Sequence, residues 1–205
     1  MKNNQSERKK SSIPFRINRK SFLGVISLVF QELIETIFTK FKIKLPKEEE
    51  VLNLVRNKSK LCDPDSVLEV IDNYAYRKTF LMNIGDEKGQ LLENAIIDSK
   101  ANNILELGVY LGYSTIRILR NLDNRSKLTS IESNKKFADI ALEHIKISGL
   151  SENHNLIIGK SNEVIPNLNE KYDFIFIDHW KELYLQDLKA LEENNLLKNN
   201  AWIFA

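Results

Sequence analysis

Residues 103–114 read Asn-Ile-Leu-Glu-Leu-Gly-Val-Tyr-Leu-Gly-Tyr-Ser, and this stretch decides the fold. Its first half is a short apolar run that is typical of a buried strand, and a helical pattern begins near Ser114. Gly108 and Gly112 permit a sharp turn between the two, where a ligand can lie against bare backbone. The stretch therefore predicts a strand–turn–helix unit of an open α/β sheet, with a nucleotide-like ligand bound at the turn.

The same alternation of strand and helix continues to the end of the chain. Short apolar strands separated by helices predict a parallel sheet with helices on both faces. The expected strands are 103–107, 128–132, 155–159, 173–178 and 201–205, and the helices between them are 114–122, 134–148, 161–168 and 180–194.

Further helices are expected before this unit. Ser66 is a candidate N-cap for the second of them, because Glu69 follows three residues later. Pro46 disfavours helix for the residue before it and divides an N-terminal extension, 1–45, from the main domain, 46–205. The three expected helices are 48–60, 67–80 and 89–99.

The basic residues are concentrated at the N-terminus. Residues 1–44 hold ten Lys or Arg and three Glu, a net charge of +7, which leaves −5 on the rest of the chain. A mildly acidic body argues against a nucleic-acid partner, which would require a basic face on the fold. The basic extension is suited instead to an anionic lipid surface.

Within the extension, an apolar run at 22–30 is followed by Glu32 and Glu35. A transmembrane span would bury these carboxylates at high cost, and a signal peptide would need a small-residue cleavage site that is not evident. A helix that lies in the membrane interface fits better, and a helix packed on the domain is the alternative. The single cysteine, Cys62, can form no internal disulfide, which fits a reducing, cytoplasmic compartment. We further expect a monomer that associates weakly with a membrane through residues 21–44.

Acidic residues lie at or near the ends of three expected strands, namely Glu106, Glu132 and Asp178. The carboxyl ends of parallel strands meet at one edge of a sheet, so these residues predict a pocket for S-adenosylmethionine. Glu132 is placed to accept the ribose hydroxyls, while Glu106 and the turn to Ser114 would face the methionine portion. The alternatives are a surface carboxylate for Glu132 and an N-cap for Ser114.

Two clusters follow later strand ends. In residues 178–181, Asp-His-Trp-Lys, the Asp is a natural ligand for a hard metal ion and the Lys a candidate base. Trp180 offers an aromatic wall and His179 a ring beside the adenine. Ser161 is expected to hydrogen-bond the adenine edge or to cap the next helix. Taken alone, residues 178–181 would be read as the solvated start of a helix.

Four segments, at 66–69, 82–89, 105–114 and 178–181, resemble in order and spacing the signatures of the catechol O-methyltransferase family. The likeness runs from about residue 48 to the end. It implies a Rossmann-like methyltransferase sheet and a Mg²⁺-dependent transfer of the methyl group of S-adenosylmethionine to one hydroxyl of a catechol, such as a catecholamine.

The resemblance also implies roles for individual residues. Asp178 corresponds to one of the metal ligands, Lys181 to the general base, and Met82 and Trp180 to walls around the methyl group and the aromatic substrate. The positions that match cofactor contacts are Ile84, Glu106, Tyr110, Ser114, Glu132, Ser161, Asn162 and His179.

The resemblance stops short of the family's full pattern. In the family an Asp-Asn pair after the fifth strand completes the metal site and two more strands complete the sheet, whereas this sequence ends at Ala205. We therefore expect either a fragment of a longer protein or a truncated paralogue. We expect the sheet of this chain to lack the last two strands and the chain itself to be catalytically poor. The alternative is that it functions as a non-catalytic interaction protein.

Overall fold

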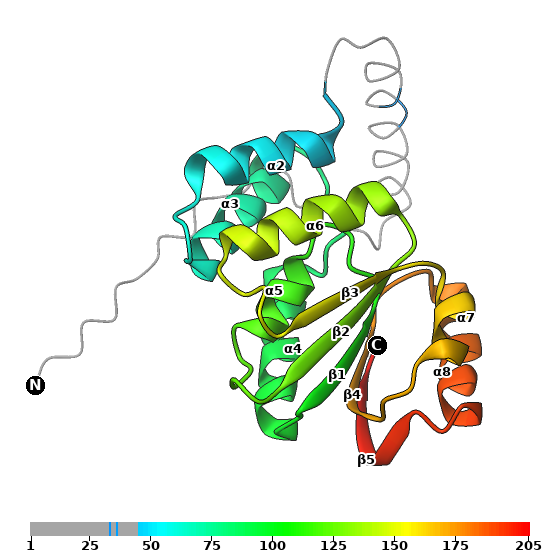
Figure 1. Cartoon of the computed structure of the whole chain (residues 1–205). Helices are drawn as coiled ribbons and strands as arrows, with labels where there is room; N and C mark the ends of the chain where they lie inside the picture. Colours follow the sequence, from blue (N-terminus) through cyan, green and yellow to red (C-terminus); the bar gives the residue numbers. More distant parts are fainter. Residues whose placement is uncertain (1–32, 34–35, 37–44) are drawn as a thin grey trace, which may run out of the picture.

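The computed structural model describes residues 33, 36 and 45–205, and the strands of this part form one parallel sheet between two layers of helices (Figure 1). The strand order is β3-β2-β1-β4-β5, so β1 lies at the centre. All four pairings are parallel. The strands are β1 Asn103–Leu107, β2 Lys127–Glu132, β3 His154–Ile158, β4 Tyr172–Ile177 and β5 Leu197–Phe204.

Helices cover both faces of the sheet, as the alternation predicted (Figure 1). Side chains on a strand point to opposite faces in turn, so Ile104 joins one core cluster while Leu105 and Leu107 join the other. One face is covered by α4 (Gly85–Ser99), α5 (Tyr113–Leu119) and α6 (Lys135–Ile147), and the other by α7 (Ser161–Val164), η1 (Ile165–Asn167) and α8 (Tyr184–Glu193).

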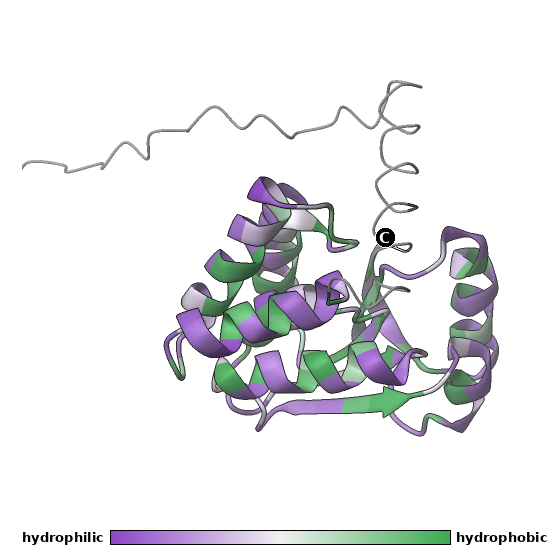
Figure 2. Cartoon of the chain, turned by 90° about the horizontal axis from the view of Figure 1, so that it is seen from above, coloured by the Kyte–Doolittle hydropathy of each residue, from purple (hydrophilic) through white to green (hydrophobic). Residues whose placement is uncertain are grey.

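Two more helices form an outer layer over α5 and α6. They are α2 (Lys47–Lys58), which packs on α6, and α3 (Pro64–Arg77), which packs on α5 and α6. Hydrophilic and hydrophobic residues alternate along these ribbons (Figure 2). Val51, Val55 and Ile71 are fully buried in the same cluster as Ile104, so this outer layer extends the core of the sheet.

The start of α3 differs from the prediction that Ser66 is its N-cap. The helix begins at Pro64, and the Asp63 side chain accepts a hydrogen bond of 3.0 Å from the Ser66 N–H. Ser66 Oγ instead accepts from the Lys60 N–H at 3.0 Å. Asp is a strong N-cap and Pro is favoured at the first helical position, so the Asp-Pro pair starts the helix earlier than the Ser does.

Helix α4 begins at Gly85, four residues before the predicted start at Gly89. Gly85 has a φ of +72°, a left-handed conformation that glycine adopts without strain, and acidic residues occupy the first turn. The earlier start brings Lys88 into the first turn of the helix rather than into a loop. β5 likewise begins at Leu197, four residues before the predicted 201.

The expected interfacial helix at 21–44 and nearly all of the extension 1–45 lie outside the described residues. Among the residues that the structure does describe, none of the helices is both long enough and apolar enough to cross a membrane.

Candidate active site

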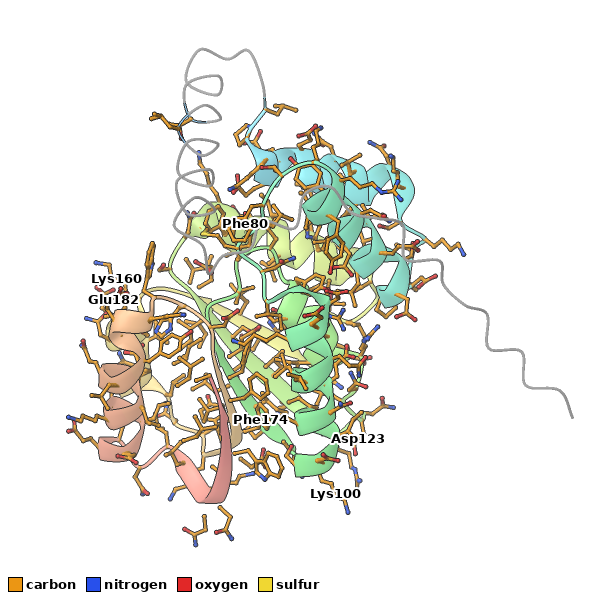
Figure 3. All side chains as sticks on the ribbon, turned by 180° about the vertical axis from the view of Figure 1, so that it is seen from behind. Phe80, Lys100, Asp123, Lys160, Phe174 and Glu182 are labelled. Carbon is orange, nitrogen blue, oxygen red and sulfur yellow. The ribbon has the colours of Figure 1, made fainter. Side chains whose placement is uncertain are left out.

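The carboxyl ends of the parallel strands open into a cavity of about 700 Å³. Its lining comes from the turns after β1, β2, β3 and β4 and from the segment that leads into α4. Figure 3 labels Phe80 and Lys160, which line it, and shows Lys100 and Asp123 at the opposite end of the sheet. A volume of this size is typical of a small-molecule site.

The cavity brings together eleven of the twelve site residues that the sequence singled out. They come from five separate segments of the chain, and the exception is Glu106. Those that line the cavity are Met82, Ile84, Tyr110, Ser114, Glu132, Ser161, Asn162, Asp178, His179, Trp180 and Lys181.

Glu132, the last residue of β2, is fixed by backbone donors. Its Oε2 accepts hydrogen bonds from the N–H groups of Val109 at 3.1 Å and Tyr110 at 2.9 Å, and its Oε1 accepts from Asn134 at 2.8 Å. A carboxylate offers about four lone-pair sites, so acceptor capacity remains for a ligand. A rigid carboxylate at this edge of the sheet is suited to binding a ribose diol.

The turn after β1 adopts backbone conformations that favour a ligand. Tyr110 has a φ of +51°, which is unusual for a residue other than glycine and strains the backbone. Strained backbone conformations of this kind occur most often at functional sites. Its ring packs edge-on against Phe137, with centroids 4.9 Å apart, and its hydroxyl donates to Glu48 at 2.8 Å. These contacts hold the strained residue in the cavity wall.

Gly108 lets the ends of β1 and β4 approach closely. Its φ is +94°, and a Cβ built there would lie 2.9 Å from the carbonyl oxygen of Asp178 and from Cβ of His179. The absent side chain therefore leaves room for the strand-end residues of β4 to reach the cavity, a role for this glycine beyond the sharp turn that the sequence predicted.

Glu106, which was expected to contact the cofactor, lies behind the cavity wall in this structure. It is fully buried and accepts hydrogen bonds from the hydroxyls of Ser114 at 2.6 Å, Thr115 at 2.8 Å and Ser130 at 2.7 Å. Burial raises its pKa to about 7 despite these three donors. Glu106 is the second-last residue of β1, so its side chain points into the core cluster under α5.

Ser114 is no N-cap either, because Gly112 occupies that position of α5. The Ser114 hydroxyl is directed to Glu106, although the residue also lines the cavity. Ser114 thereby links the buried carboxyl to the ligand site. Ser161 opens α7 directly after the N-cap residue Lys160, and its side chain is buried at the cavity edge.

Asp178, directly after β4, feels the charge of two lysines. Burial raises the pKa of its carboxyl to about 6, and the positive charges of Lys88 and Lys181 oppose that rise. Both lysines line the cavity. The arrangement places an acid and two amines at one point of the wall, which is the chemistry required to remove a proton from a bound hydroxyl.

The described residues do not by themselves fit a magnesium site. Magnesium requires oxygen ligands in near-octahedral geometry, and in the described part of the chain His, Cys, Asp and Glu form no group of three that could hold a metal ion. Asp178 is a single carboxylate and does not supply the set of oxygen ligands that Mg²⁺ requires. We therefore assign no step of the chemistry to a metal.

The sequence did not single out several other residues of the cavity wall. Lys88 was missed because its helix was predicted to start after it, and Tyr184 because it lies beyond the strand-end motif. The sequence did contain a signal for each of them: Lys88 lies within a segment that matches the family, and Tyr184 follows Lys181 by three residues. The cavity residues of this kind are Phe80, Asn83, Lys88, Phe137, Lys160 and Tyr184.

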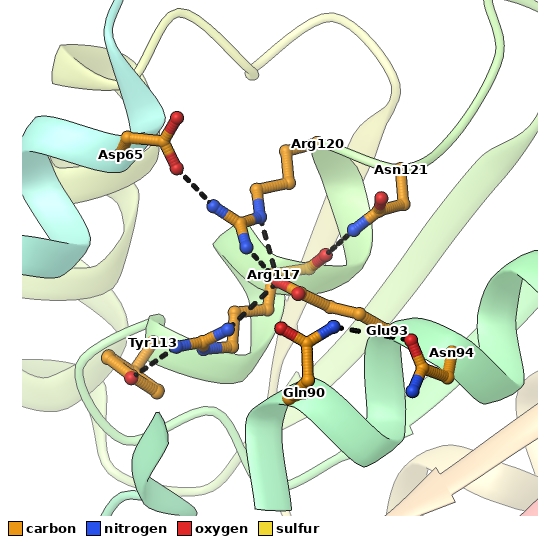
Figure 4. A network of polar contacts seen from close by, with 8 residues as sticks. All are labelled: Asp65, Gln90, Glu93, Asn94, Tyr113, Arg117, Arg120 and Asn121. Carbon is orange, nitrogen blue, oxygen red and sulfur yellow. Dashed lines mark hydrogen bonds and ion pairs between the residues drawn. The ribbon is translucent and has the colours of Figure 1, made fainter. Parts of the chain in front are cut away.

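A buried ion-pair network supports the wall from behind (Figure 4). Glu93 on α4 accepts from Arg117 at 3.0 Å and from Arg120 at 2.7 Å, both on the α5 side. Arg117 also donates to the hydroxyl of Tyr113 at 2.8 Å, and the Tyr113 ring lines the cavity. A Cβ on Gly89 would lie 2.5 Å from Arg117 Nε, so α4 and α5 are in close contact here.

Comparison with known proteins agrees with this geometry. The model of a family described as O-methyltransferase matches residues 58–202. The catechol O-methyltransferase of Mus musculus is 35% identical over 187 residues, which cover 89% of this chain and 71% of that protein. The catechol O-methyltransferase of Bos taurus is 33% identical over 189 residues, with 90% and 70% covered.

Solved structures share the fold. An O-methyltransferase from Bacillus cereus in complex with SAH superposes with a TM-score of 0.58 at 23% identity and covers 83% of this chain and 70% of its own. The O-methyltransferase TomG from Streptomyces achromogenes in complex with SAM gives a TM-score of 0.59 at 22% identity, with 66% and 62% covered.

Proposed function

The chain belongs to the O-methyltransferase family, and we propose that it transfers the methyl group of S-adenosylmethionine to one hydroxyl of a catechol. The observation that carries the proposal is Glu132, a carboxylate locked by three backbone N–H groups in a cavity that also contains Asp178 and Lys181. The acceptor class comes from the names of the relatives that are more than 30% identical.

The residues present fit S-adenosylmethionine. Glu132 would hold the ribose, Ser161 and Asn162 the adenine edge, and the turn from Gly108 to Ser114 the methionine portion. When bound, the cofactor supplies an electrophilic methyl group on a sulfonium. The Glu132 carboxylate is already held by three backbone donors, so it would lose little freedom on binding, which lowers the entropic cost.

The remaining chemistry belongs to the acceptor. Lys181 lines the cavity beside Asp178 and, as the neutral amine, would take the proton from the acceptor's hydroxyl oxygen. Met82 and Trp180, with 51% and 72% of their surface exposed, would cover the aromatic ring of the acceptor at the mouth. Holding the hydroxyl oxygen against the reacting centre contributes much of the rate in such displacements.

The test is methyl transfer from labelled S-adenosylmethionine to a catechol, with resorcinol as the isomeric control acceptor. We expect transfer to the catechol alone. Lys181→Met should lower kcat by about 100-fold or more, as removal of a general base does, without weakening S-adenosylhomocysteine binding. Lys189→Met, an exposed lysine on α8, is the matched control and should keep full activity.

Two results would contradict the proposal. Equal transfer to resorcinol would remove the catechol assignment, and absence of transfer from a cofactor-bound protein would favour the non-catalytic interaction protein. Magnesium dependence is a separate expectation carried by the family resemblance, so the assay is run with Mg²⁺ and with a chelator.

A further inference from the structure

One histidine of the cavity wall is held by a carboxylate that lies outside the cavity. His179 Nε2 lies 2.5 Å from Oδ2 of Asp187, which is only 1% exposed and belongs to the first turn of α8. Asp187 does not line the cavity, whereas His179 does. Since the carboxylate oxygen accepts, the ring proton in this contact is on Nε2.

A further contact fixes the same ring. His179 stacks on Tyr184, with ring centroids 5.4 Å apart and planes 11° from parallel. Gly108 lies close to His179 Cβ, since a Cβ added to the glycine would lie 2.9 Å from it. The ring is thus held by a hydrogen bond and a stacking partner, and the residue has little free space at its Cβ.

The second polar atom of each side chain of the pair is not used in a hydrogen bond. His179 Nδ1 and Asp187 Oδ1 are both buried and have no hydrogen-bond partner among the described residues. A buried carboxylate with a single donor is costly, so core stability alone does not account for the pair. His179 and its stacking partner Tyr184 both line the cavity, and an aromatic pair in a cavity wall suits packing against a heteroaromatic base.

We propose that Asp187 is a positioning residue for cofactor recognition, which acts by holding the His179 ring against the purine base of the bound cofactor. The proposal rests on the proposed function, because it takes S-adenosylmethionine as the ligand of this cavity. Asp187 contributes no contact of its own; without it the ring rotates about its Cβ–Cγ bond and the wall for the base is lost.

A pair of ligands separates this role from a general loss of structure. S-adenosylhomocysteine contains the base, and S-ribosylhomocysteine lacks it but keeps the ribose and the amino acid. By calorimetry, Asp187→Ala should weaken binding of S-adenosylhomocysteine by about tenfold, or about 1.4 kcal/mol, and leave S-ribosylhomocysteine binding unchanged. Asp187→Asn, whose amide oxygen still accepts the hydrogen bond, should recover most of the loss.

The controls make each outcome decisive. Glu193→Ala removes an exposed carboxylate from the same helix and should change neither affinity. His179→Ala should mimic Asp187→Ala, and the double variant should be no weaker than either single one, because the two residues act as one unit. Equal losses for both ligands, or no loss, would overturn the positioning role.

A wild-type protein that binds neither ligand would overturn the proposed function as well, so the two failures are distinguishable. If Asp187→Ala does not fold, ¹⁵N NMR of the histidine rings keeps the proposal testable in the wild-type protein. The chain has three histidines, and His179→Ala assigns the relevant signal. A His179 ring with a proton fixed on Nε2 supports the proposal, and an Nε2 without a proton contradicts it.

Discussion

Glu106 carries its carboxyl group in a fully buried site behind the cavity wall. Burial raises its pKa from the ordinary 4.5 to about 7, so the folded protein holds this proton more tightly than the unfolded chain does. The contribution of Glu106 to stability is therefore full below pH 4.5 and is lost as the pH rises through about 7.

The substitution Glu106→Gln removes this titration. As the pH rises from about 5 to about 8, the unfolding free energy of the variant relative to wild type should increase by roughly 2.5 kcal/mol, measured by urea unfolding. Taking the difference from wild type removes the opposite pH dependence that the buried His144 and the half-buried His154, with lowered pKa values, contribute. The exposed Glu152→Gln is the control, and a difference that does not change with pH would contradict the account.

The contrast between Glu106 and Glu132 marks how far local sequence can predict a site. Both were expected in the cavity as strand-end acids, and Glu132 is there. Glu106 is paired in register with Ser130 of β2, whose hydroxyl it accepts from, together with two hydroxyls of α5. The register between two strands and the side chains of the following helix are tertiary features. The spacing of acidic residues along the sequence therefore could not predict that Glu106 is enclosed by hydroxyl groups.

Gly108 is the point where the end of β1 meets the end of β4. In Gly108→Ala the new Cβ would combine a left-handed φ with contacts of 2.9 Å to Asp178 and His179. Gly85→Ala has a similar φ, +72°, but no atom within 4 Å, so it isolates the backbone strain of about 1–2 kcal/mol. We expect Gly108→Ala to lower Tm more than Gly85→Ala and to weaken cofactor binding; equal effects would contradict the close approach.

The buried ion pairs between α4 and α5 also depend on a single residue, Glu93. Glu93 is 3% exposed and pairs with Arg117 and Arg120, so Glu93→Gln leaves buried positive charge without its partner. We expect this substitution to lower the unfolding free energy by about 3 kcal/mol. The control is Asp139→Asn, which breaks the exposed pair Lys135–Asp139 and should lower the unfolding free energy by less than about 1 kcal/mol. Similar losses in chemical denaturation would contradict a role for burial.

At the scale of elements, hydrophobic periodicity predicted every described strand to within about four residues. The errors lie at the ends of elements, where capping decides. Asp63 and Pro64 start α3 earlier than Ser66 would, and Gly85 starts α4 earlier than Gly89. The difference reaches the site, because Lys88, which lies in the first turn of α4, lines the cavity with Asp178.

For the whole molecule, the charge of +7 on residues 1–44 predicts contact with an anionic surface. We expect the full chain to co-sediment with vesicles that contain anionic lipid and less with neutral ones, and added salt to weaken the difference. A variant with Lys40, Lys42 and Lys44 replaced by Glu should sediment less. Equal sedimentation with both kinds of vesicle would contradict the expectation.

The central claim is that the strand ends of this sheet form an S-adenosylmethionine site. It is tested most directly by isothermal titration of S-adenosylmethionine into the full chain, with and without Mg²⁺. We predict saturable binding at one site with micromolar affinity, and a large loss of affinity in Glu132→Ala. A folded protein that binds no cofactor, or that binds it equally well after Glu132→Ala, would contradict the claim.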